Sequence, residues 1–330
     1  MAKLFDTALP YLLSGISVGG QYALIAIGYT MVYGILRLIN FAHGDIFMVA
    51  GLLMIYINTA LTPLLTNMGL APDTAFVVAI LISVILVLIL TVLLGFGVEQ
   101  AAYRPLRSAP RMSVMISAIG VSYLIQNFAI YATGGLAKTY PQNGKQFPWL
   151  SETVAIGTTS VKIVTIITPF LTALLVVALV MLIKKTKIGM AMRAVSKDFE
   201  TSRLMGIKIN KVISMTFIIG SFLAAVGSML YFTNYTSVTP TSGAMPGLKA
   251  FVAAVFGGIG SVPGAVVGAF IIGICENILK GLDNILITMG VIESNFGFST
   301  FSDAFTFVLL IIVLCVKPTG LFGEKSTDKV

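Results

Sequence analysis

The chain alternates between long apolar runs and short polar segments. Apolar runs cover approximately residues 8–36, 46–62, 74–97, 113–134, 163–183 and 212–235. A helix needs about 20 apolar residues to cross the hydrocarbon core of a membrane, and most of these runs reach that length. They also lack the strict alternation of a membrane β-barrel. We therefore predict an all-α polytopic membrane protein with about eight transmembrane segments, some of them broken or re-entrant.

The apolar sequence between about residues 248 and 280 is interrupted by small residues, namely Gly257, Gly258, Gly260, Ser261, Pro263 and Gly264. Each flank is short for a full crossing, so we expect two short helices that meet at the break or one half that re-enters. The next apolar segment, 303–316, is expected to end in the cytosol, which favours a pair that enters and returns. Interrupted helices often mark transport pathways, whereas glycines also allow tight packing. Both interpretations stay open.

A polar break interrupts the first apolar region. Arg37, Asn40, His43 and Asp45 lie within nine positions of one another, and Gly44 between them disfavours helix. Asp45 stands where a helix N-cap would stand, just before the next apolar run. Ionisable groups near membrane depth are costly and usually face a partner, a cavity or the interface. These residues either line or gate a translocation path, or Arg37 reaches the aqueous surface while Asp45 caps a helix.

Other polar side chains lie inside apolar segments. The small residues between 257 and 264 form a second break. Together with the first break they give the candidate path or gating residues, which are Arg37, Asn40, His43, Asp45, Gln126, Asn127, Gly257, Gly258, Gly260, Pro263, Glu276 and Asn277. Gly15 and Gly19 have the small-xxx-small spacing that lets membrane helices approach closely.

Composition supports one membrane domain. Of the 330 residues, 57% are hydrophobic and 10% are charged, whereas soluble domains carry about 25% charged residues. The mean hydropathy is +0.98. We assign residues 1–323 to one membrane domain and 324–330 to a short cytoplasmic tail. Cys275 and Cys315 both lie in apolar segments, and we interpret them as small hydrophobic residues.

The distribution of basic residues predicts the orientation. The net charge is +8, but the positive residues cluster in a few loops, which is a topology signal and not a nucleic-acid site. Two spans separate the Arg104–Arg111 loop from the Lys184–Lys211 loop, so both are expected in the cytoplasm, as is the chain after Lys317. The connection 135–162 is then extracytoplasmic, and the N-terminus lies outside if both early segments cross.

The loop 184–211 contains an amphipathic pattern. Met192, Val195, Phe199, Ser202 and Met205 recur every three or four residues and form one largely apolar stripe. The pattern predicts one helix bounded by Gly189 and Gly206. Such a helix can lie on anionic lipid or dock into a groove of a partner protein, and the acidic Asp198 and Glu200 favour a partner. The candidate coupling residues are Gly189, Met192, Arg193, Val195, Phe199, Glu200, Met205 and Gly206.

Four blocks resemble a known family. They are GQYALIAIGYTMVYGILRLINFAHGDIFMVAG, TKIGMAMRAVSKDFETSRLMGI, FGGIGSVPGAVVGAFIIGICENI and KPTGLFG. In this order they are similar to the LivH-type permeases, the membrane subunits of bacterial ABC importers for branched-chain amino acids. The resemblance runs from about Gly15 to Gly323.

The resemblance implies an importer in the bacterial cytoplasmic (inner) membrane. Its partners would be a second, LivM-type permease subunit, two cytosolic ABC ATPases and an extracytoplasmic substrate-binding protein, and the chain itself would contact membrane lipid. The sequence contains no G-x-x-x-x-G-K-[ST] phosphate loop. ATP and Mg²⁺ are therefore expected on the ATPases, with no cofactor, metal or catalytic residue on this chain. Closure of the ATPases would push on the Gly189–Gly206 helix and switch the cavity from outward- to inward-facing.

Other functions stay open. Interrupted helices and buried ionisable groups also suit an ion-coupled secondary transporter, and a channel for a small polar solute is a third hypothesis. The related ABC permeases for urea and short amides share much of the same signature. The solute is thus a branched-chain amino acid, another neutral amino acid or a urea-like compound. No nucleophile–base pair is visible, so we do not expect an enzyme.

Overall fold

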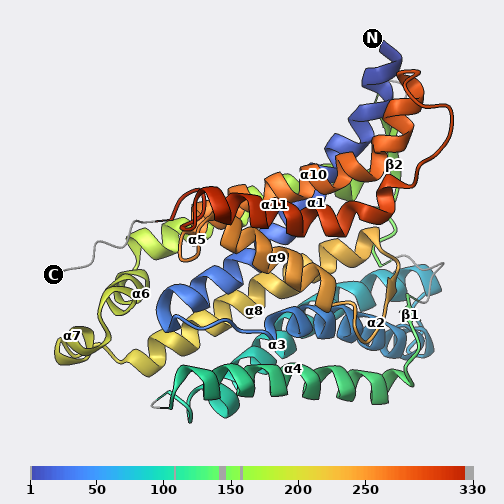
Figure 1. Ribbon diagram of the computed structural model, residues 1–330. Helices are drawn as coiled ribbons and strands as arrows, with labels where there is room; N and C mark the ends of the chain where they lie inside the picture. The colour runs from blue at the N-terminus through green and yellow to red at the C-terminus, as the bar shows by residue number, and fades with distance from the viewer. Residues whose placement is uncertain (1, 108, 141–145, 157–158, 324–330) are drawn as a thin grey trace.

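The computed structural model describes residues 2–107, 109–140, 146–156 and 159–323. Within these ranges, eight helices are long and apolar enough to cross a membrane. Six are single α-helices, which are α1 (Ala2–Leu36), α2 (His43–Asn67), α4 (Arg111–Thr133), α5 (Ile163–Lys185), α8 (Ile209–Asn234) and α10 (Val262–Thr288), and a further span, Pro72–Tyr103, combines α3 (Pro72–Val98) with a π-helical turn. The eighth combines the 3-10 turn η2 (Phe298–Phe301) with α11 (Ser302–Val316). The prediction of an all-α polytopic membrane fold is confirmed (Figure 1).

Shorter elements connect these helices. A π-helical turn, η1 (Glu99–Tyr103), extends α3, and α9 (Ala244–Gly257) is a 14-residue apolar helix. Two small helices, α6 (Lys187–Lys197) and α7 (Phe199–Leu204), follow α5. Strand β1 (Lys138–Thr139) pairs antiparallel with β4 (Ser237–Val238), and β2 (Thr153–Ile156) pairs antiparallel with β3 (Thr159–Lys162).

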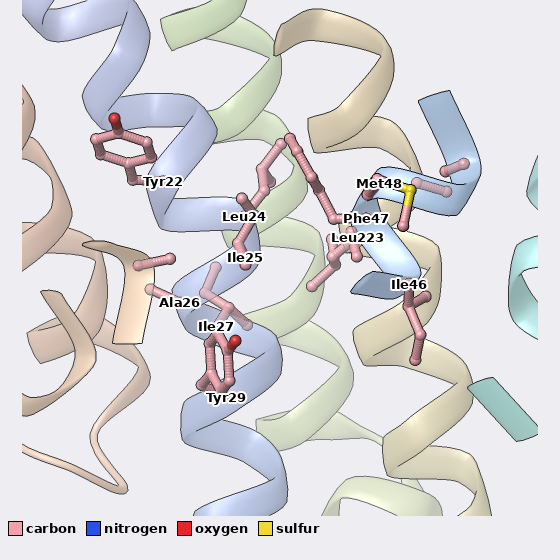
Figure 2. Packing of buried hydrophobic residues seen from close by; sticks show 14 of the residues in the cluster. Tyr22, Leu24, Ile25, Ala26, Ile27, Tyr29, Ile46, Phe47, Met48 and Leu223 are labelled. Atoms are coloured by element: carbon pink, nitrogen blue, oxygen red, sulfur yellow. The ribbon is translucent and has the colours of Figure 1, made fainter. Parts of the chain in front are cut away.

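Helices α1 and α8 form the centre of the bundle. In each of them 72% of the apolar window is buried by the rest of the protein. Side chains of α1, including Leu24 and Ile25, meet Phe47 of α2 and Leu223 of α8 (Figure 2). Other helices therefore surround most of α1. This helix has little contact with lipid.

Close glycine contacts join α1 to α10. A Cβ atom at Gly15 would lie 2.8 Å from the Cα atom of Ile274, and one at Gly19 would lie 2.8 Å from the Cα atom of Phe270. Gly273 approaches Gly19 from the other helix. The small-xxx-small spacing of Gly15 and Gly19 therefore lets two backbones touch, as the sequence predicted.

The basic segments lie together at one end of the bundle. Figure 1 shows α6, α7, the connection from α3 to α4 and the end of α11 at that end, which we call the basic end. The start of α1 and strands β1 and β2 lie at the opposite end, which we call the outer end. This arrangement agrees with the predicted placement of the basic loops on one side. Residues 324–330, the predicted tail, lie outside the described residues.

Helices α1 and α2 both extend past a proline, beyond the apolar runs 8–36 and 46–62 of the sequence. Helix α1 begins at Ala2 and continues through Pro10, and α2 continues through Pro63 to Asn67. Membrane helices tolerate proline where neighbouring groups satisfy the backbone.

Helices α9 and α10 form an antiparallel pair around the second break. Ala253 faces Gly268, and Gly257 faces Gly264, so the chain enters and returns as the sequence predicted. The expectation that both flanks are short is correct for α9 only, because α10 has 27 residues. The C-terminal segment closes the turn: the Leu321 N–H donates to the Phe256 carbonyl and the Phe322 N–H donates to the Gly257 carbonyl, both at 2.9 Å.

Candidate functional site

The first polar break occupies the connection between α1 and α2. Arg37 is exposed and has a left-handed backbone with a φ of 55°. Helix α2 begins at His43, so Gly44 and Asp45 lie in its first turn and Ala42 occupies the N-cap position. The prediction that Gly44 breaks the helix and Asp45 caps it is therefore wrong. The Asp45 carboxylate turns away from its own helix end because it has partners on another helix.

Those partners lie on α4. The Asp45 carboxylate accepts a 2.5 Å hydrogen bond from the Ser122 hydroxyl and a 2.9 Å hydrogen bond from the Gln126 amide. Asp45 is buried, and two neutral donors lower the cost of burying its charge. The structure thus brings together two sequence candidates, Asp45 and Gln126. It places Asn127 on the exposed face of α4, where its amide donates to the Tyr123 carbonyl at 2.8 Å.

His43 is buried against α1. A Cβ atom at Gly28 would overlap the imidazole, and the Tyr29 ring meets it edge-on with the centroids 5.0 Å apart. The Nε2 atom has no hydrogen-bond partner among the described residues. The only histidine of the chain therefore fits a notch that the glycine at position 28 leaves open, which is a packing contact. A role for His43 in gating stays a prediction.

Gly44 lets α2 touch the start of α9. A Cβ atom at Gly44 would lie 2.7 Å from the Gly243 carbonyl oxygen, and one at Gly247 would lie 2.9 Å from the Gly44 Cα atom. Gly44 therefore permits a backbone crossing, and it does not interrupt a helix. Nothing local in the sequence indicates this contact, since its partners are about 200 residues away in the chain.

A buried carboxylate that the sequence did not single out lies at the basic end. Glu99 accepts 2.8 Å hydrogen bonds from the hydroxyl of Ser214 and the amide of Gln100. It also forms an ion pair with Arg107, whose guanidinium donates to Asn210 of α8 as well. Partial burial lowers the pKa of Arg107, and the Glu99 charge acts in the opposite direction. These hydrogen bonds and the ion pair hold the connection between α3 and α4 against the start of α8.

Asn40 is held in place by the same region. Its Oδ1 atom accepts a 2.9 Å hydrogen bond from the Tyr103 hydroxyl, and both side chains are buried. Tyr103 belongs to the π-helical turn η1. Asn40 therefore joins the first polar break to the end of α3, which is consistent with a structural joint between the two.

Glu276 is the centre of a buried ion network. Its Oε1 atom lies 2.8 Å from the Lys249 ammonium and 2.5 Å from the Lys280 ammonium, and its Oε2 atom accepts a 3.1 Å hydrogen bond from Tyr22. Lys249 also lies 2.6 Å from the Asp303 carboxylate. The network joins α1, α9, α10 and α11. Glu276 was a sequence candidate, whereas Lys249 and Asp303 were not. The neighbouring candidate Asn277 donates to the carbonyl of Gly273 in its own helix.

The glycine and proline candidates of the second break shape its turn. Gly257 packs against the α10 backbone, and Gly258, with a φ of 107°, packs against Gly323. Pro263 lies in the first turn of α10, where its missing N–H costs nothing. Gly260 has a φ of 96°, a conformation that favours glycine. A role for these residues in gating stays a prediction.

The predicted single helix between Gly189 and Gly206 is two helices. The Asp198 carboxylate accepts backbone hydrogen bonds from Glu200 at 2.9 Å and Thr201 at 3.1 Å, and thereby caps α7. Hydrogen bonds from Thr201 and Glu200 lower the pKa of Asp198. Gly189 lies inside α6, and the preceding Thr186 accepts from its N–H. The break occurs at Asp198 because this cap begins a new helix in a new direction.

The apolar stripe of α6 faces the protein's own bundle. Met192 is 4% exposed and Val195 is 0% exposed, and α6 packs on α1, α5 and α8. The most exposed apolar side chains of this segment lie at the end of α7 and directly after it, where Leu204 is 87% exposed and Met205 is 78% exposed, whereas Met190 on the outer side of α6 is 52% exposed. Phe199 is partly exposed. The periodicity identified the correct stripe in α6, but it does not say which surface the stripe contacts.

A hollow opens between the end of α8 and the start of α9. Aromatic, hydroxyl and apolar groups line it, among them Tyr231, Tyr235, Thr239, Ser242, Met245 and Pro246. The nearby pair of strands β1 and β4 places it toward the outer end (Figure 1). The sequence did not indicate this site, because its residues belong to an unremarkable polar connection. In the described part of the chain, no cluster of His, Cys, Asp or Glu side chains suits a metal ion.

Comparison with known proteins agrees with this architecture. The family model for the branched-chain amino acid transport system / permease component matches residues 11–314. The high-affinity branched-chain amino acid transport system permease protein LivH of Salmonella typhimurium is 37% identical over 100% of both chains. The corresponding protein BraD of Pseudomonas aeruginosa is 36% identical over 98% of both. The probable LivH protein of Methanocaldococcus jannaschii is 26% identical over 91% of this chain and 88% of its own. The chain therefore belongs to the family of permease components of branched-chain amino acid transport systems.

Proposed function

We propose that this chain carries branched-chain amino acids across the bacterial cytoplasmic (inner) membrane as a permease subunit of an ATP-driven importer. The observation that carries the proposal is the full-length relationship to LivH permeases, at 37% identity. The described fold supports it, because nearly every element is a membrane helix or a short connection. In this role the chain is not an enzyme, and ATP hydrolysis takes place on partner subunits.

The partners follow from the same proposal. They are a second, LivM-type permease subunit, two cytosolic ABC ATPases and an extracytoplasmic substrate-binding protein. The basic end faces the cytoplasm in this arrangement, in accord with the positive-inside rule. The ATPases then meet the basic end, and the binding protein meets the outer end.

We assign the contact with an ATPase to the exposed surface of α7 and the residues beside it. Leu204 and Met205 supply an apolar tip, which Arg203 and Glu200 surround with charge. An exposed apolar patch rimmed by polar groups is typical of a protein interface. Helix α6 transmits the motion, because its buried Met192 and Val195 are wedged against the bundle. A push on α7 therefore reaches α1, α5 and α8 directly.

The hollow at the outer end suits the entry of an amino acid. Its hydroxyl groups can hydrogen-bond the charged ends of a zwitterion, and Met245, Pro246 and the tyrosine rings can contact an aliphatic side chain. Its residues are neutral, so binding is weak and release is fast. Selectivity in this mechanism lies mostly in the substrate-binding protein.

Reconstitution tests the function. The complete transporter is placed in proteoliposomes with its binding protein, and uptake of labelled leucine, isoleucine and valine is compared with uptake of alanine and urea. We expect uptake of the three branched-chain amino acids and little uptake of urea. Preferred uptake of urea assigns the chain to the urea and short-amide permeases. Uptake by this chain alone that collapses with the ion gradient indicates a secondary transporter.

A further inference from the structure

Helix α4 has the lowest mean hydropathy among the poorly buried spans of the described chain, which also include α3, α5 and the span that ends with α11 (mean hydropathy 2.2, with 11% of its window buried). The poorly buried helices α3 and α5 have mean hydropathies of 3.5 and 2.8, with 28% and 17% of their windows buried. The least apolar span, α1, has a mean hydropathy of 1.3 and is 72% buried. Helix α4 combines a mean hydropathy of 1.5 with only 22% burial. A helix this polar is not suited to being surrounded by lipid.

Both faces of α4 contribute to its low hydropathy: Ser122 and Gln126 face α2, while polar side chains are also exposed on the opposite face, beside the apolar Leu124 and Phe128. Ile116, Gly120, Tyr123, Asn127 and Tyr131 recur at intervals of three or four residues, so they form one stripe. All five are exposed, with Tyr123 at 62% and Tyr131 at 86%. A Cβ atom at Gly120 would meet nothing within 4 Å. The stripe therefore faces away from the rest of this chain along its whole length.

The opposite face of α4 packs against the rest of this chain. Val114, Ala118, Ile125 and Ala129 are buried, and Ser122 and Gln126 bind the Asp45 carboxylate. Helix α4 packs only on α2 and η1 to any extent and lies at the edge of the bundle (Figure 1). These contacts fix the rotation of the helix, so the polar stripe cannot turn inward to find partners.

The composition of the stripe is that of a helix–helix interface in a membrane. An exposed glycine allows a second helix to approach closely, and an asparagine amide can hydrogen-bond across such a contact. The Asn127 amide already donates one hydrogen bond to the Tyr123 carbonyl, but in lipid its remaining polar groups and the exposed tyrosine hydroxyls find no partners and are costly. The stripe is thus stabilised by a protein neighbour that supplies both close contact and polar groups.

The length of the stripe identifies the kind of neighbour. Ile116 and Tyr131 are fifteen positions apart, which corresponds to about 22 Å along a helix. The hydrocarbon core is about 30 Å thick. A cytosolic ATPase or an extracytoplasmic binding protein reaches only the ends of such a stripe, so its occupant must itself cross the membrane.

We propose that the Ile116–Tyr131 face of α4 packs against a membrane helix of the second permease subunit. This inference rests on the proposed function, which supplies that subunit. It assigns the subunit interface to a peripheral helix that is fastened to the first polar break through Asp45. Movement of the neighbouring subunit then reaches the start of α2 through the hydrogen bonds of Ser122 and Gln126.

Matched glycine substitutions test the interface. Gly120 and Gly97 are both exposed helix glycines, one on the stripe and one on α3, and a Cβ atom at either position would meet nothing within 4 Å. We expect Gly120→Leu to lower the amount of second permease subunit that co-purifies by about tenfold, and Gly97→Leu to leave it unchanged. Equal recovery of the subunit with both variants overturns the proposal.

A spin label reports the surroundings of the stripe directly. In a Cys275→Ala/Cys315→Ala background, the label is attached at Asn127→Cys, and at Leu93→Cys on the exposed face of α3 as a control. In the complete transporter in lipid, we expect position 127 to be shielded from both oxygen and a water-soluble nickel chelate, and position 93 to be accessible to oxygen. Access of oxygen at 127 shows lipid contact, and access of the nickel chelate shows a water-filled passage. Either result overturns the interface.

The same samples separate this inference from the proposed function. Uptake of leucine is measured with the unlabelled transporter. Normal uptake together with a lipid-exposed position 127 removes the interface and leaves the function intact. Absence of ATP-dependent leucine uptake in the unlabelled complex removes the function, whatever the label reports.

Discussion

The carboxylate of Asp45, at the start of α2, accepts a 2.5 Å hydrogen bond from the hydroxyl of Ser122 on α4. Gln126 donates a second bond to the same carboxylate. Together with the Tyr56 hydroxyl, which donates to the Ala132 carbonyl at 3.0 Å, these bonds link the peripheral helix α4 to α2. Asp45 has the sequence position of a helix cap, but its side chain instead joins α2 to α4. We call this contact the joint.

Removal of this joint is expected to destabilise the protein. Asp45→Ala removes the charged acceptor of the partly buried Ser122 hydroxyl and Gln126 amide, which costs about 1–3 kcal/mol. Thermal unfolding in detergent measures the loss. The control is Asp73→Ala, in the exposed first turn of α3, which should change stability by about 0.5 kcal/mol or less. Equal unfolding temperatures for the two variants would show that the joint contributes nothing.

The fit between Gly28 and His43 predicts a rescue. Gly28→Ala places a methyl group on the buried imidazole, and such overpacking typically costs about 1–3 kcal/mol. Adding His43→Ala should restore most of the stability, because the methyl group then has space. A double-mutant cycle of unfolding measures the coupling. If the double variant is as unstable as the sum of the single variants, the contact is not the cause.

The ion network predicts that its two lysines, Lys249 and Lys280, contribute unequally to the stability of the protein. Lys249→Met leaves both Glu276 and Asp303 without this cation, and breaking a buried pair costs about 3–5 kcal/mol. Lys280 lies on the more exposed side of the network, so Lys280→Met should cost less. Yield and unfolding temperature of the purified variants test the order. The reverse order would show that Glu276 depends mainly on Lys280.

The two helices of the basic end predict opposite outcomes for similar substitutions. Leu204→Asp changes an exposed tip, so the membrane fold should persist while co-purification of the ATPases falls. Val195→Asp places a charge in the bundle, so the protein itself should fail to accumulate. Phe199→Asp should resemble Leu204→Asp in a weaker form. Normal ATPase binding by Leu204→Asp, measured on purified complexes, would exclude this tip as the contact.

The spans and the antiparallel pair of α9 and α10 could be predicted because both depend on local apolar length and on parity. The role of Asp45 could not, since its partners on α4 are 77 and 81 residues away. Rules for helix caps consider only residues that are neighbours in sequence. At Asp45 the hydrogen bonds to the distant helix α4 take the place of a local cap. Lys249 did carry a signal, as a lone lysine in an apolar stretch, but its partners Glu276 and Asp303 were not evident without the fold.

The amphipathic loop 184–211 shows a different limit of prediction from sequence. The stripe through Met192 and Val195 was visible, yet its period does not tell whether a stripe faces a partner or the chain's own bundle. Asp198, followed by Glu200 and Thr201, was a readable N-cap signal inside the supposed single helix. Given that signal, two helices could have been predicted. The exposure of Leu204 depends on the new direction of α7 and needed the structure.

The most direct test of the central claim is the initial rate of leucine uptake into proteoliposomes that contain the complete transporter, its binding protein and either ATP or a non-hydrolysable analogue. We predict uptake with ATP, none with the analogue, and a reduced rate for Leu204→Asp when equal amounts of the permease are present. Equal uptake with ATP and with the analogue would contradict the claim that ATP hydrolysis drives transport through this chain.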